Sequence, residues 1–372
     1  MRILQIAPLW ETVPPPAYGG TEAVVHALVE ELVHMGHDVT LCASGDSQTS
    51  ARLHAVYPRS LRTADDLRDK NIYSWQHSIL SLRDARDYDI VHNHGGEEVM
   101  ALHHLAPEAA MLSTMHCLIT PDTTFIWDRY QGYFNAISWS QRRLMPPVEG
   151  GTFAGVVYNG IDVPSFPFQR EKEDYLLCLS RMSPEKGPQL AVEVARRTGR
   201  RLVLAGKVDP ADFNFFATVV APLIDGERVV FLGEADARLK RELYRNAYCV
   251  LAPIVWDEPF GLVMAEAMAC GTPVIAFARG AAPEIVRHGE TGFIVGNIDE
   301  MTEAVSRVRE IDPAACREHV SRKFDAPRMA ENYVRLYQEI LNGRLVADQS
   351  RLIAELSRAA PVSQGAASAQ VA

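Results

Sequence analysis

The chain has 372 residues, which exceeds the length at which one hydrophobic core usually keeps growing, so two domains are the first expectation. With 47% hydrophobic and 23% charged residues, the composition is that of an ordinary soluble globular protein. The net charge of -10 argues against a polyanion such as nucleic acid as partner, because binding a phosphate backbone normally needs a basic surface.

Targeting signals are not evident in the sequence. The apolar stretch at residues 1–8 is too short for the core of a signal peptide, and no window approaches about 18 uninterrupted apolar residues. We therefore expect a cytoplasmic protein without a transmembrane segment, while peripheral contact with a membrane stays open. The six cysteines are scattered without a Cys-x-x-Cys pair, which predicts buried free thiols.

Short β-rich apolar runs alternate with amphipathic helical patterns, which is typical of doubly wound domains with parallel sheets. A helix is predicted after Gly20, with Val24, Leu28 and Leu32 on its buried face and Gly36 as its stop signal. The strands predicted in the first half lie at residues 3–7, 39–43, 90–92, 112–115, 136–138 and 156–158.

A second series of the same kind follows the turn-rich segment 159–168, whose Gly and Pro content marks a boundary. Its strands are predicted at residues 176–179, 202–205, 229–232, 250–252, 274–277 and 293–295, and its helices at 189–197 and 237–245. A last helix is predicted at 329–341. Ligands bind at the carboxyl ends of the strands in such sheets, so a cleft between two such domains is the expected site.

Two carboxylates frame a predicted helix start in the second half. The segment Glu258-Pro-Phe-Gly-Leu-Val-Met-Ala-Glu266 puts Glu258 in a loop and Glu266 about a turn and a half into a helix that begins near Gly261. The free N–H groups and positive dipole of a helix start suit phosphates, and carboxylates suit hydroxyls. Together they indicate a sugar nucleotide, although either Glu alone is also compatible with a solvated helix start.

Two cations follow the predicted strand at 176–179. Arg181 and Lys186 are separated by a turn that contains Pro184. At the carboxyl end of a strand, two fixed positive charges can neutralise a diphosphate as it becomes the leaving group. A solvated basic loop is the alternative interpretation.

A pair of glycines, Gly19 and Gly20, opens the first predicted helix after the run of prolines at 14–16. Paired glycines let the backbone approach a ligand closely at a helix start. The segment is not G-x-G-x-x-G, so the dinucleotide fingerprint is absent. A plain turn with Thr21 as N-cap is the alternative.

Histidines are concentrated early in the chain, at residues 92, 94, 103, 104 and 116. His92 and His94 would project to one side of a strand, which makes a metal site conceivable. No carboxylate or Cys lies at a convincing ligand spacing and there is no Asp-x-Asp, so we expect no metal. His94 is then a packing or hydrogen-bonding residue at a strand end.

These motifs resemble those of one enzyme family. The segment from Glu258 to Glu266 is similar to the E-x7-E motif of the retaining GT-B glycosyltransferases of family 4, also called glycosyl transferases group 1, and the resemblance covers nearly the whole chain. The segment around Arg181 and Lys186 resembles the G-R-x-x-x-x-K-G signature, although Ser180 replaces the usual Gly.

The resemblance implies a GT-B fold, in which two Rossmann-like doubly wound α/β domains face each other across a cleft. Residues 1–158 would form the acceptor-side domain, completed by a crossing helix at about 326–345. Residues 165–325 would form the domain that binds the nucleotide sugar, and the Ala- and Ser-rich tail at 346–372 would be partly disordered.

Roles follow from the same resemblance. Glu266 would hold the ribose hydroxyls of the donor, and Glu258 the hydroxyls of its sugar. Arg181 and Lys186 would bind the diphosphate and stabilise the departing charge. The other positions implied are the sugar-pocket backbone at Phe260, Gly261, Leu262 and Val263, and His116, Gly19 and Gly20 from the first domain.

Three further segments match family patterns and are interpreted as structural. They are Ser138-Trp-Ser-Gln141, the hinge Val157-Tyr-Asn-Gly-Ile-Asp162, and the turn and helix around Pro283-Glu284. Within the family, the order of motifs resembles the subgroup of the avilamycin pathway enzyme, for which UDP-glucose is the best guess of donor. Acceptor contacts are expected from first-domain loops and from Trp10, Trp127 and Trp139.

The sequence therefore predicts a glycosyltransferase that moves a hexose from a nucleoside-diphosphate sugar to an unidentified acceptor. No residue stands out as the nucleophile of a double displacement, which favours a front-face mechanism. The missing Asp-x-Asp and the basic diphosphate site indicate that this mechanism is metal-independent. Two alternatives stay open: a sugar-nucleotide epimerase or hydrolase of the same fold, and a catalytically silent sugar-nucleotide sensor. The oligomeric state is not predicted.

Overall fold

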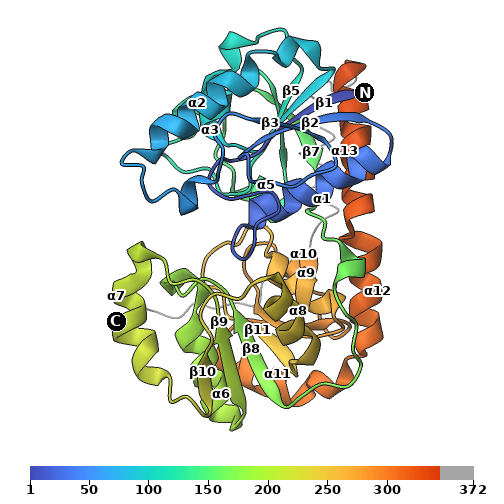
Figure 1. Cartoon of the computed structure of the whole chain (residues 1–372). Coiled ribbons are helices and arrows are strands. Elements are labelled where there is room, and N and C mark those ends of the chain that lie inside the picture. Colours follow the sequence, from blue (N-terminus) through green and yellow to red (C-terminus); the bar gives the residue numbers. More distant parts are fainter. Residues whose placement is uncertain (344–372) are drawn as a thin grey trace.

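The computed structural model describes residues 1–343 and contains two parallel sheets, each covered by helices. Figure 1 shows the two halves one above the other, with the N-terminal strand in the upper half and the long red helix along one side of both. This is the doubly wound GT-B architecture that the sequence predicts. The tail predicted at 346–372 lies outside the described residues.

The first sheet has seven strands in the order β3-β2-β1-β4-β5-β6-β7. Its strands are β1 (Arg2–Ile6), β2 (Asp38–Ala43), β3 (Arg52–Ala55), β4 (Ile90–Asn93), β5 (Met111–Thr114), β6 (Tyr133–Ala136) and β7 (Thr152–Val156). The helices are α1 (Gly20–His34), α2 (Lys70–Leu82), α3 (Glu97–Ala101), α4 (Thr124–Trp127) and α5 (Trp139–Leu144). The central strand β1 is parallel to both β2 and β4 and is buried on both faces, as its apolar sequence indicates.

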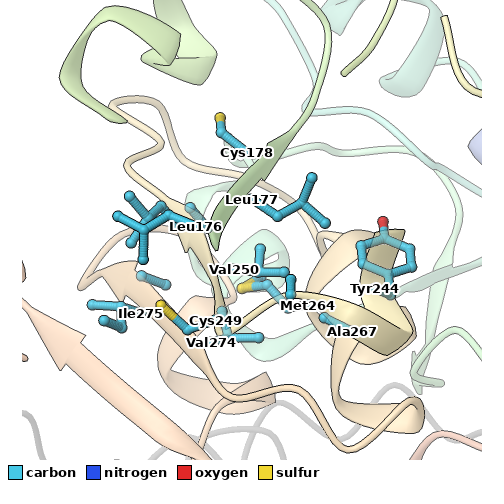
Figure 2. Close-up of a cluster of buried hydrophobic side chains, with 14 of the residues drawn as sticks. Leu176, Leu177, Cys178, Tyr244, Cys249, Val250, Met264, Ala267, Val274 and Ile275 are labelled. Carbon is cyan, nitrogen blue, oxygen red and sulfur yellow. The ribbon is translucent and has the colours of Figure 1, made fainter. Parts of the chain in front are cut away.

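The second sheet has six strands in the order β10-β9-β8-β11-β12-β13. Its strands are β8 (Tyr175–Leu179), β9 (Arg201–Ala205), β10 (Val229–Phe231), β11 (Cys249–Ala252), β12 (Val274–Phe277) and β13 (Gly292–Val295). The helices are α6 (Pro188–Thr198), α7 (Phe213–Phe215), α8 (Ala237–Asn246), α9 (Leu262–Ala269), α10 (Ala282–Ile285), α11 (Ile298–Arg307) and α12 (Pro313–Lys323). Figure 2 shows its core, where strand residues such as Leu176 and Val250 pack against Met264 of α9.

The final described helix, α13 (Ala326–Leu341), crosses from the second half to the first (Figure 1). Its apolar face carries Met329, Tyr333 and Tyr337, which belong to the same buried cluster as Ile3 and Val29 of the first half. The chain therefore completes the core of its first sheet with its last described helix.

The structure corrects three details of the sequence analysis. Strand β3 was not predicted, because its residues Arg52–Ala55 form a short, half-exposed edge strand without a continuous apolar run. Strands β6 and β7 end two residues earlier than predicted. Helix α1 begins at Gly20 with Gly19 as its N-cap, so the alternative of a Thr21 cap is wrong.

Within the described residues, we find no helix that is both long and apolar enough to cross a bilayer.

Candidate active site

The order of strands reverses at two places, between β1 and β4 in the first sheet and between β8 and β11 in the second. Each reversal leaves a crevice at the carboxyl ends of the strands, where ligands of open α/β sheets bind. Gly19 and Gly20 follow β1, Arg181 and Lys186 follow β8, and Glu258 follows β11. The topology therefore brings the candidate residues to the two crevices.

Helix α9 begins at a glycine that adopts a left-handed conformation. Gly261 has φ +89 and serves as the N-cap, a backbone conformation that other residues rarely adopt. Just before it, the backbone of Glu258 is held by Gly280 and Ala281, because the Ala281 N–H donates to the Glu258 carbonyl over 2.8 Å. A Cβ at Gly280 would lie 2.3 Å from the Glu258 nitrogen, so only glycine permits this approach.

The side chain of Glu258 forms an ion pair with Lys186, and both side chains are mostly buried, at 15% and 17% exposure. Trp256 donates its indole N–H to the same carboxylate over 2.8 Å, and the Lys186 ammonium lies 5.1 Å from the centre of the Trp256 ring. The cation expected at the diphosphate and the carboxylate expected at the sugar are therefore direct neighbours.

The loop after β8 and the loop after β11, which carry Lys186 and Glu258, are hydrogen-bonded to each other. The Val255 N–H donates to the Glu185 carbonyl over 2.9 Å, and a Cβ at Gly187 would lie 2.3 Å from the Pro253 carbonyl oxygen. Arg181 forms an ion pair with Glu185 and lies 3.6 Å from Asp212. The loop that carries the two cations is therefore packed directly against the loop that carries Glu258.

Glu266 lies in α9 and is 5% exposed. Lys240 forms an ion pair with its Oε1 at 3.0 Å, and the Tyr244 hydroxyl donates to its Oε2 over 2.9 Å. Burial and the neighbouring carboxylate raise the pKa of Tyr244 well above its usual range, so the phenol stays a donor. Neither Lys240 nor Tyr244 was predicted from the sequence, although their i, i+4 spacing places them on the same face of α8.

The first half contributes the start of α1. Gly20 lies so close to the second half that a Cβ there would be 3.4 Å from the Leu262 side chain, which means that the starts of α1 and α9 face each other. Gly19 has φ +142 and packs on Pro15, where a Cβ would come within 2.7 Å. Both glycines therefore sit where the two halves meet.

A cavity of about 410 Å³ opens beside these glycines. It is lined by Trp10, Glu11, Tyr18, Gly19, Gly20, Thr21, Glu22, Arg62, Lys70 and Lys207. Lys207 comes from the second half and the other residues from the first, so the cavity lies between the two.

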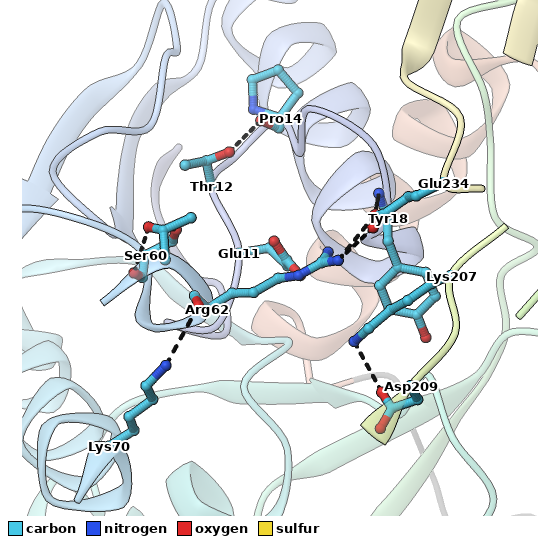
Figure 3. A network of polar contacts seen from close by, with 11 residues as sticks. Glu11, Thr12, Pro14, Tyr18, Ser60, Arg62, Lys70, Lys207, Asp209 and Glu234 are labelled. Carbon is cyan, nitrogen blue, oxygen red and sulfur yellow. Dashed lines mark hydrogen bonds and ion pairs between the residues drawn. The ribbon is translucent and has the colours of Figure 1, made fainter. Parts of the chain in front are cut away.

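Arg62 links the two halves at the edge of this cavity, as Figure 3 shows. It donates to Glu11 at 2.8 Å and, through one terminal nitrogen, to both oxygens of Glu234 at 2.8 and 3.0 Å. The Tyr18 N–H donates to the same Glu234 over 3.1 Å. Lys207 pairs with Asp209 at 2.9 Å and lies 5.1 Å from the centre of the Tyr18 ring.

Glu22 is the other acidic group in the cavity lining, and sequence reasoning assigned it no role. Its side chain lies close to Gly19, with one carboxyl oxygen 3.1 Å from the position of a Cβ there. Burial raises the pKa of Glu22 to about 7, and burial also raises the pKa of Glu11. A carboxyl group that is half protonated near neutral pH can donate a hydrogen bond to a bound hydroxyl or accept one from it.

His116 follows β5 and is partly exposed, while His94 and His92 are buried beneath it. The rings of His94 and His116 share a hydrogen bond of 2.9 Å, so His94 is the hydrogen-bonding residue that we expected. Burial lowers the pKa of His116 to about 4 and lowers the pKa values of the other two well below the usual range. Across residues 1–343, no group of three or more His, Cys, Asp or Glu residues is arranged to hold a metal ion.

Comparisons with known proteins agree with this geometry. Two family descriptions match consecutive parts of the chain: "Glycosyltransferase Family 4" matches residues 18–150 and "Glycosyl transferases group 1" matches residues 164–319. Both halves of the chain match glycosyltransferase families, and the protein is a glycosyltransferase.

Individual relatives are more distant. The glycosyltransferase is 30% identical over 210 residues to an uncharacterized glycosyltransferase of Methanocaldococcus jannaschii, which covers 49% of this chain and 53% of that protein. It is 24% identical to N-acetyl-alpha-D-glucosaminyl L-malate synthase of Bacillus anthracis, over 89% of this chain and 97% of that enzyme. The chain thus spans about half the length of the first of these relatives and nearly all of the second.

Among solved structures, AviGT4, a glycosyltransferase involved in avilamycin A biosynthesis, superposes with a TM-score of 0.73 at 28% identity. The superposition covers 92% of this chain and 98% of that one. Similarity over both halves at once supports the GT-B fold for the whole described chain.

Glu284 of α10 belongs to a segment that we interpreted as structural, with hydrogen bonds only inside its own turn. In this glycosyltransferase it also binds groups of the first half. Its carboxylate accepts hydrogen bonds from the N–H groups of Trp139 and Ser140 in the first half, at 2.9 and 2.6 Å. The Tyr158 hydroxyl also donates to it over 2.9 Å. Glu284 therefore joins the second sheet to the start of α5.

The family segment Ser138-Trp-Ser-Gln141 holds the loop of His116. Ser138 caps α5 by accepting a hydrogen bond from the Gln141 N–H, and the Gln141 amide donates to the carbonyls of Met115 and Cys117 at 2.9 and 2.8 Å. His116 lies between these two anchored residues. Its position is thus fixed by the strand-to-helix turn that follows it in the sheet.

Two expectations about side chains are corrected in the glycosyltransferase. Trp127 is fully buried in the first core and forms an edge-to-face contact with Phe134, so it does not line an acceptor site. Trp10 does line the cavity. Five of the cysteines are buried as predicted, but Cys117 is exposed.

Proposed function

We propose that this glycosyltransferase moves a hexosyl group from a nucleoside-diphosphate sugar to an acceptor hydroxyl with retention at the anomeric carbon. The observation that carries the proposal is the convergence of Lys186, Glu258 and the start of α9 at one strand-order reversal, opposite the start of α1. Fixed cations and helix starts suit a diphosphate, and carboxylates suit sugar hydroxyls. UDP-glucose is the first donor to test, since the chain resembles the avilamycin subgroup.

Each residue has a proposed role toward the donor. Glu266, held by Lys240 and Tyr244, accepts hydrogen bonds from the ribose hydroxyls. Glu258 accepts hydrogen bonds from hydroxyls of the donor sugar. The backbone of residues 260–263 completes the sugar pocket.

Arg181 and Lys186 hold the diphosphate. Each is paired with a carboxylate, Arg181 with Glu185 and Lys186 with Glu258, so binding the diphosphate exchanges one anionic partner for another. As the bond from the anomeric carbon to the phosphate oxygen breaks, negative charge grows on the diphosphate and these contacts strengthen. Because side chains supply this charge, we propose that the reaction needs no metal ion.

The acceptor hydroxyl attacks from the face that the diphosphate leaves. The new bond joins the acceptor oxygen to the anomeric carbon, and the proton of that hydroxyl passes to the departing phosphate oxygen, which balances the reaction without an enzymatic nucleophile. The cavity beside Gly19, lined by Trp10 and Glu22, is the proposed acceptor site. Closure around the reacting groups excludes water and favours transfer over hydrolysis.

The test is product analysis with a panel of nucleoside-diphosphate sugars and acceptors, in the presence and absence of EDTA. We expect a glycosylated acceptor with retained configuration and equal rates with EDTA. Free sugar or an epimerised sugar nucleotide as sole product would establish one of the alternatives, and donor binding without any product would establish the sensor. Lys186→Ala, which removes one contact to the leaving group, should lower kcat/KM by roughly two to three decades.

A further inference from the structure

A chain of hydrogen bonds runs through the buried polar side chains beneath His116. It connects strands β1, β4, β5 and β6 of the first sheet with the crossing helix α13. Its members, in order, are Asn135, Thr114, His92, Tyr337, Gln5, His94 and His116. Every member except His116 is buried. The direction of each bond can be deduced from one end.

The direction is set by Asn135, whose side-chain N–H donates to the backbone carbonyl of Ala136 over 3.2 Å. A carbonyl can only accept, so the Oδ1 atom of Asn135 faces Thr114 and accepts the single proton of the Thr114 hydroxyl. The oxygen of Thr114 must therefore accept in its 2.7 Å contact with the Nε2 atom of His92. His92 thus carries its proton on Nε2.

The next three bonds follow from the neutrality of His92. It is fully buried, and its two ring nitrogens contact only the hydroxyl groups of Thr114 and Tyr337, so it is an uncharged imidazole. Its Nδ1 atom accepts a hydrogen bond from the Tyr337 hydroxyl over 2.6 Å. The Tyr337 oxygen then accepts from the Gln5 amide N–H over 3.1 Å, which turns the Gln5 carbonyl oxygen toward His94.

The Gln5 oxygen lies 2.9 Å from the Nε2 atom of His94 and must accept, so His94 is protonated there. His94 is also buried and uncharged, which leaves its Nδ1 atom as an acceptor for the Nε2–H of His116 at 2.9 Å. His116 in turn keeps an unprotonated Nδ1 atom. Within residues 1–343, no group forms a hydrogen bond with the Nδ1 atom of His116, and this atom is accessible to solvent.

The loop of His116 lies beside the second half of the molecule, because Gln141 of α5 holds the carbonyls on either side of His116 and the start of α5 donates to Glu284 of that half. Partial loss of solvation raises the pKa of the neighbouring Cys117 thiol, and the charges of Glu97 in the first half and of Glu258, Lys186 and Arg181 across the cleft also act on that pKa. The loop of His116 is therefore near the groups proposed to bind the donor.

We propose that Gln5, Tyr337 and His94 are positioning residues that fix His116 in the Nε2-protonated tautomer, so that its Nδ1 atom accepts a hydrogen bond from a hydroxyl of the bound sugar. The identity of that ligand rests on the proposed function, whereas the tautomer does not. An acceptor atom selects a hydroxyl and disfavours a carboxylate at the same place. The glycosyltransferase should therefore discriminate against donors in which that hydroxyl is replaced by an acidic group.

The direct test is nitrogen NMR of the full chain labelled with ¹⁵N-histidine, with His116 assigned by loss of its signals in His116→Gln. Long-range proton–nitrogen correlations distinguish a protonated from an unprotonated ring nitrogen. For His92, His94 and His116, we expect an Nε2-protonated pattern in the wild type. An Nδ1-protonated His116 would overturn the proposal, and this measurement does not depend on enzyme activity.

Tyr337→Phe tests the chain itself, because it removes the donor to His92 and the acceptor for the Gln5 amide. Gln5 can then turn its amide, and we expect His94 and His116 to become mixtures of tautomers, with a loss of roughly threefold to tenfold in kcat/KM for the sugar donor. Tyr333→Phe is the matched control, since Tyr333 lies one turn earlier on α13 and its hydroxyl contacts only Thr114 and Asn135 at the far end of the chain. The Ala136 carbonyl still fixes the orientation of the Asn135 amide in this variant.

Tyr333→Phe should leave the His116 signals unchanged. Equal changes in both variants would mean that α13 packing, and not the bond order, controls the tautomer. If no sugar transfer is found with any donor while the Nε2 tautomer is observed, the proposed function fails and the tautomer assignment stands.

Discussion

The two carboxylates of the E-x7-E segment differ in what holds them. Glu266 is fixed in a helix by Lys240 and Tyr244, whereas Glu258 lies in a loop and pairs with Lys186. A carboxylate that is already fixed, like Glu266, suits the nucleotide part of the donor, which does not change during sugar transfer. A carboxylate that can exchange its partner, like Glu258, suits the sugar that reacts.

This difference predicts a division of labour. Glu266→Gln keeps the shape but loses a charged acceptor, so affinity for the free nucleoside diphosphate should fall by about 1–3 kcal/mol. Glu258→Gln should leave that affinity almost unchanged and lower turnover, because the diphosphate alone has no sugar for it to hold. Calorimetry and initial rates of both variants decide between these roles.

Glu242→Gln serves as the control, since Glu242 forms only an exposed pair with Arg238 on the surface of α8. If Glu258→Gln weakens diphosphate binding as much as Glu266→Gln does, the assigned roles are wrong.

The buried carboxyl of Glu22 predicts a pH dependence of stability. Its pKa is about 7 in the folded protein, above its ordinary value of 4.5. Below pH 4.5 the carboxyl is protonated in both the folded and the unfolded state. Between pH 4.5 and 7 it ionises in the unfolded chain first, so the free energy of unfolding falls as the pH rises. Above pH 7 the loss stays constant at roughly 3 kcal/mol.

Glu22→Gln removes this ionisation, so the free energy of unfolding of the wild type should drop relative to the variant as pH rises from 4.5 to 7. Denaturant unfolding of both proteins across that range measures the difference. Parallel curves would show that Glu22 ionises freely in the folded protein.

At the scale of elements, the alternation of short apolar runs with amphipathic helical patterns predicts both sheets. The central strands are visible as continuous apolar runs because they are buried on both faces. The edge strand β3 (Arg52–Ala55) lacks that signal. Motif spacing places Lys186 and Glu258 after the right strands, but it cannot reveal their ion pair, which depends on how the two loops pack. The reach of Glu284 to α5 is invisible for the same reason.

Helix α9 offers a test of how much its glycine start matters. Gly261→Ala places a Cβ at φ +89, which costs about 1–2 kcal/mol, and brings it within 2.5 Å of the flexible end of Met264. We expect lower stability together with a loss of donor affinity, because the 260–263 backbone shifts. Thermal unfolding and donor titration measure the two effects.

Gly199→Ala is the matched control at the end of α6, where φ is +67 and nothing lies within 4 Å. It should lose similar stability without weakening donor binding. Equal donor affinity in both variants would show that the start of α9 does not form the pocket.

At the scale of the whole molecule, polar contacts at two separate places tie the two halves together. Glu284 accepts from the start of α5, and Arg62 donates to Glu234 beside the cavity. The second contact, with the Tyr18 N–H as a further donor to Glu234, closes over the proposed acceptor site. It should therefore influence the approach of the acceptor more than the stability of either half.

A double-mutant cycle tests that expectation. Arg62→Ala and Glu234→Ala should each lower kcat/KM for the acceptor several-fold. In free energy, the loss in the double variant should be smaller than the sum of the two single losses, because both remove the Arg62–Glu234 contact while each also removes one contact of its own, with Glu11 or with the Tyr18 N–H. The effect should shrink at high salt, since these side chains are only partly buried. Arg2→Ala, in an exposed pair with Asp89 away from the cavity, should have no effect. Additive losses would show that the two residues act separately.

The crossing of α13 also determines the order in which the chain can fold during synthesis. Met329, Tyr333 and Tyr337 complete the core of the first sheet, yet a ribosome must first make residues 157–325, which contain the entire second sheet. At about 5 to 20 residues per second, this takes on the order of 10 s or longer. During that interval the first half carries an uncovered apolar face, which is the kind of surface that chaperones bind, while the second half can already close its own core. The half that is synthesised first is therefore the half that matures last.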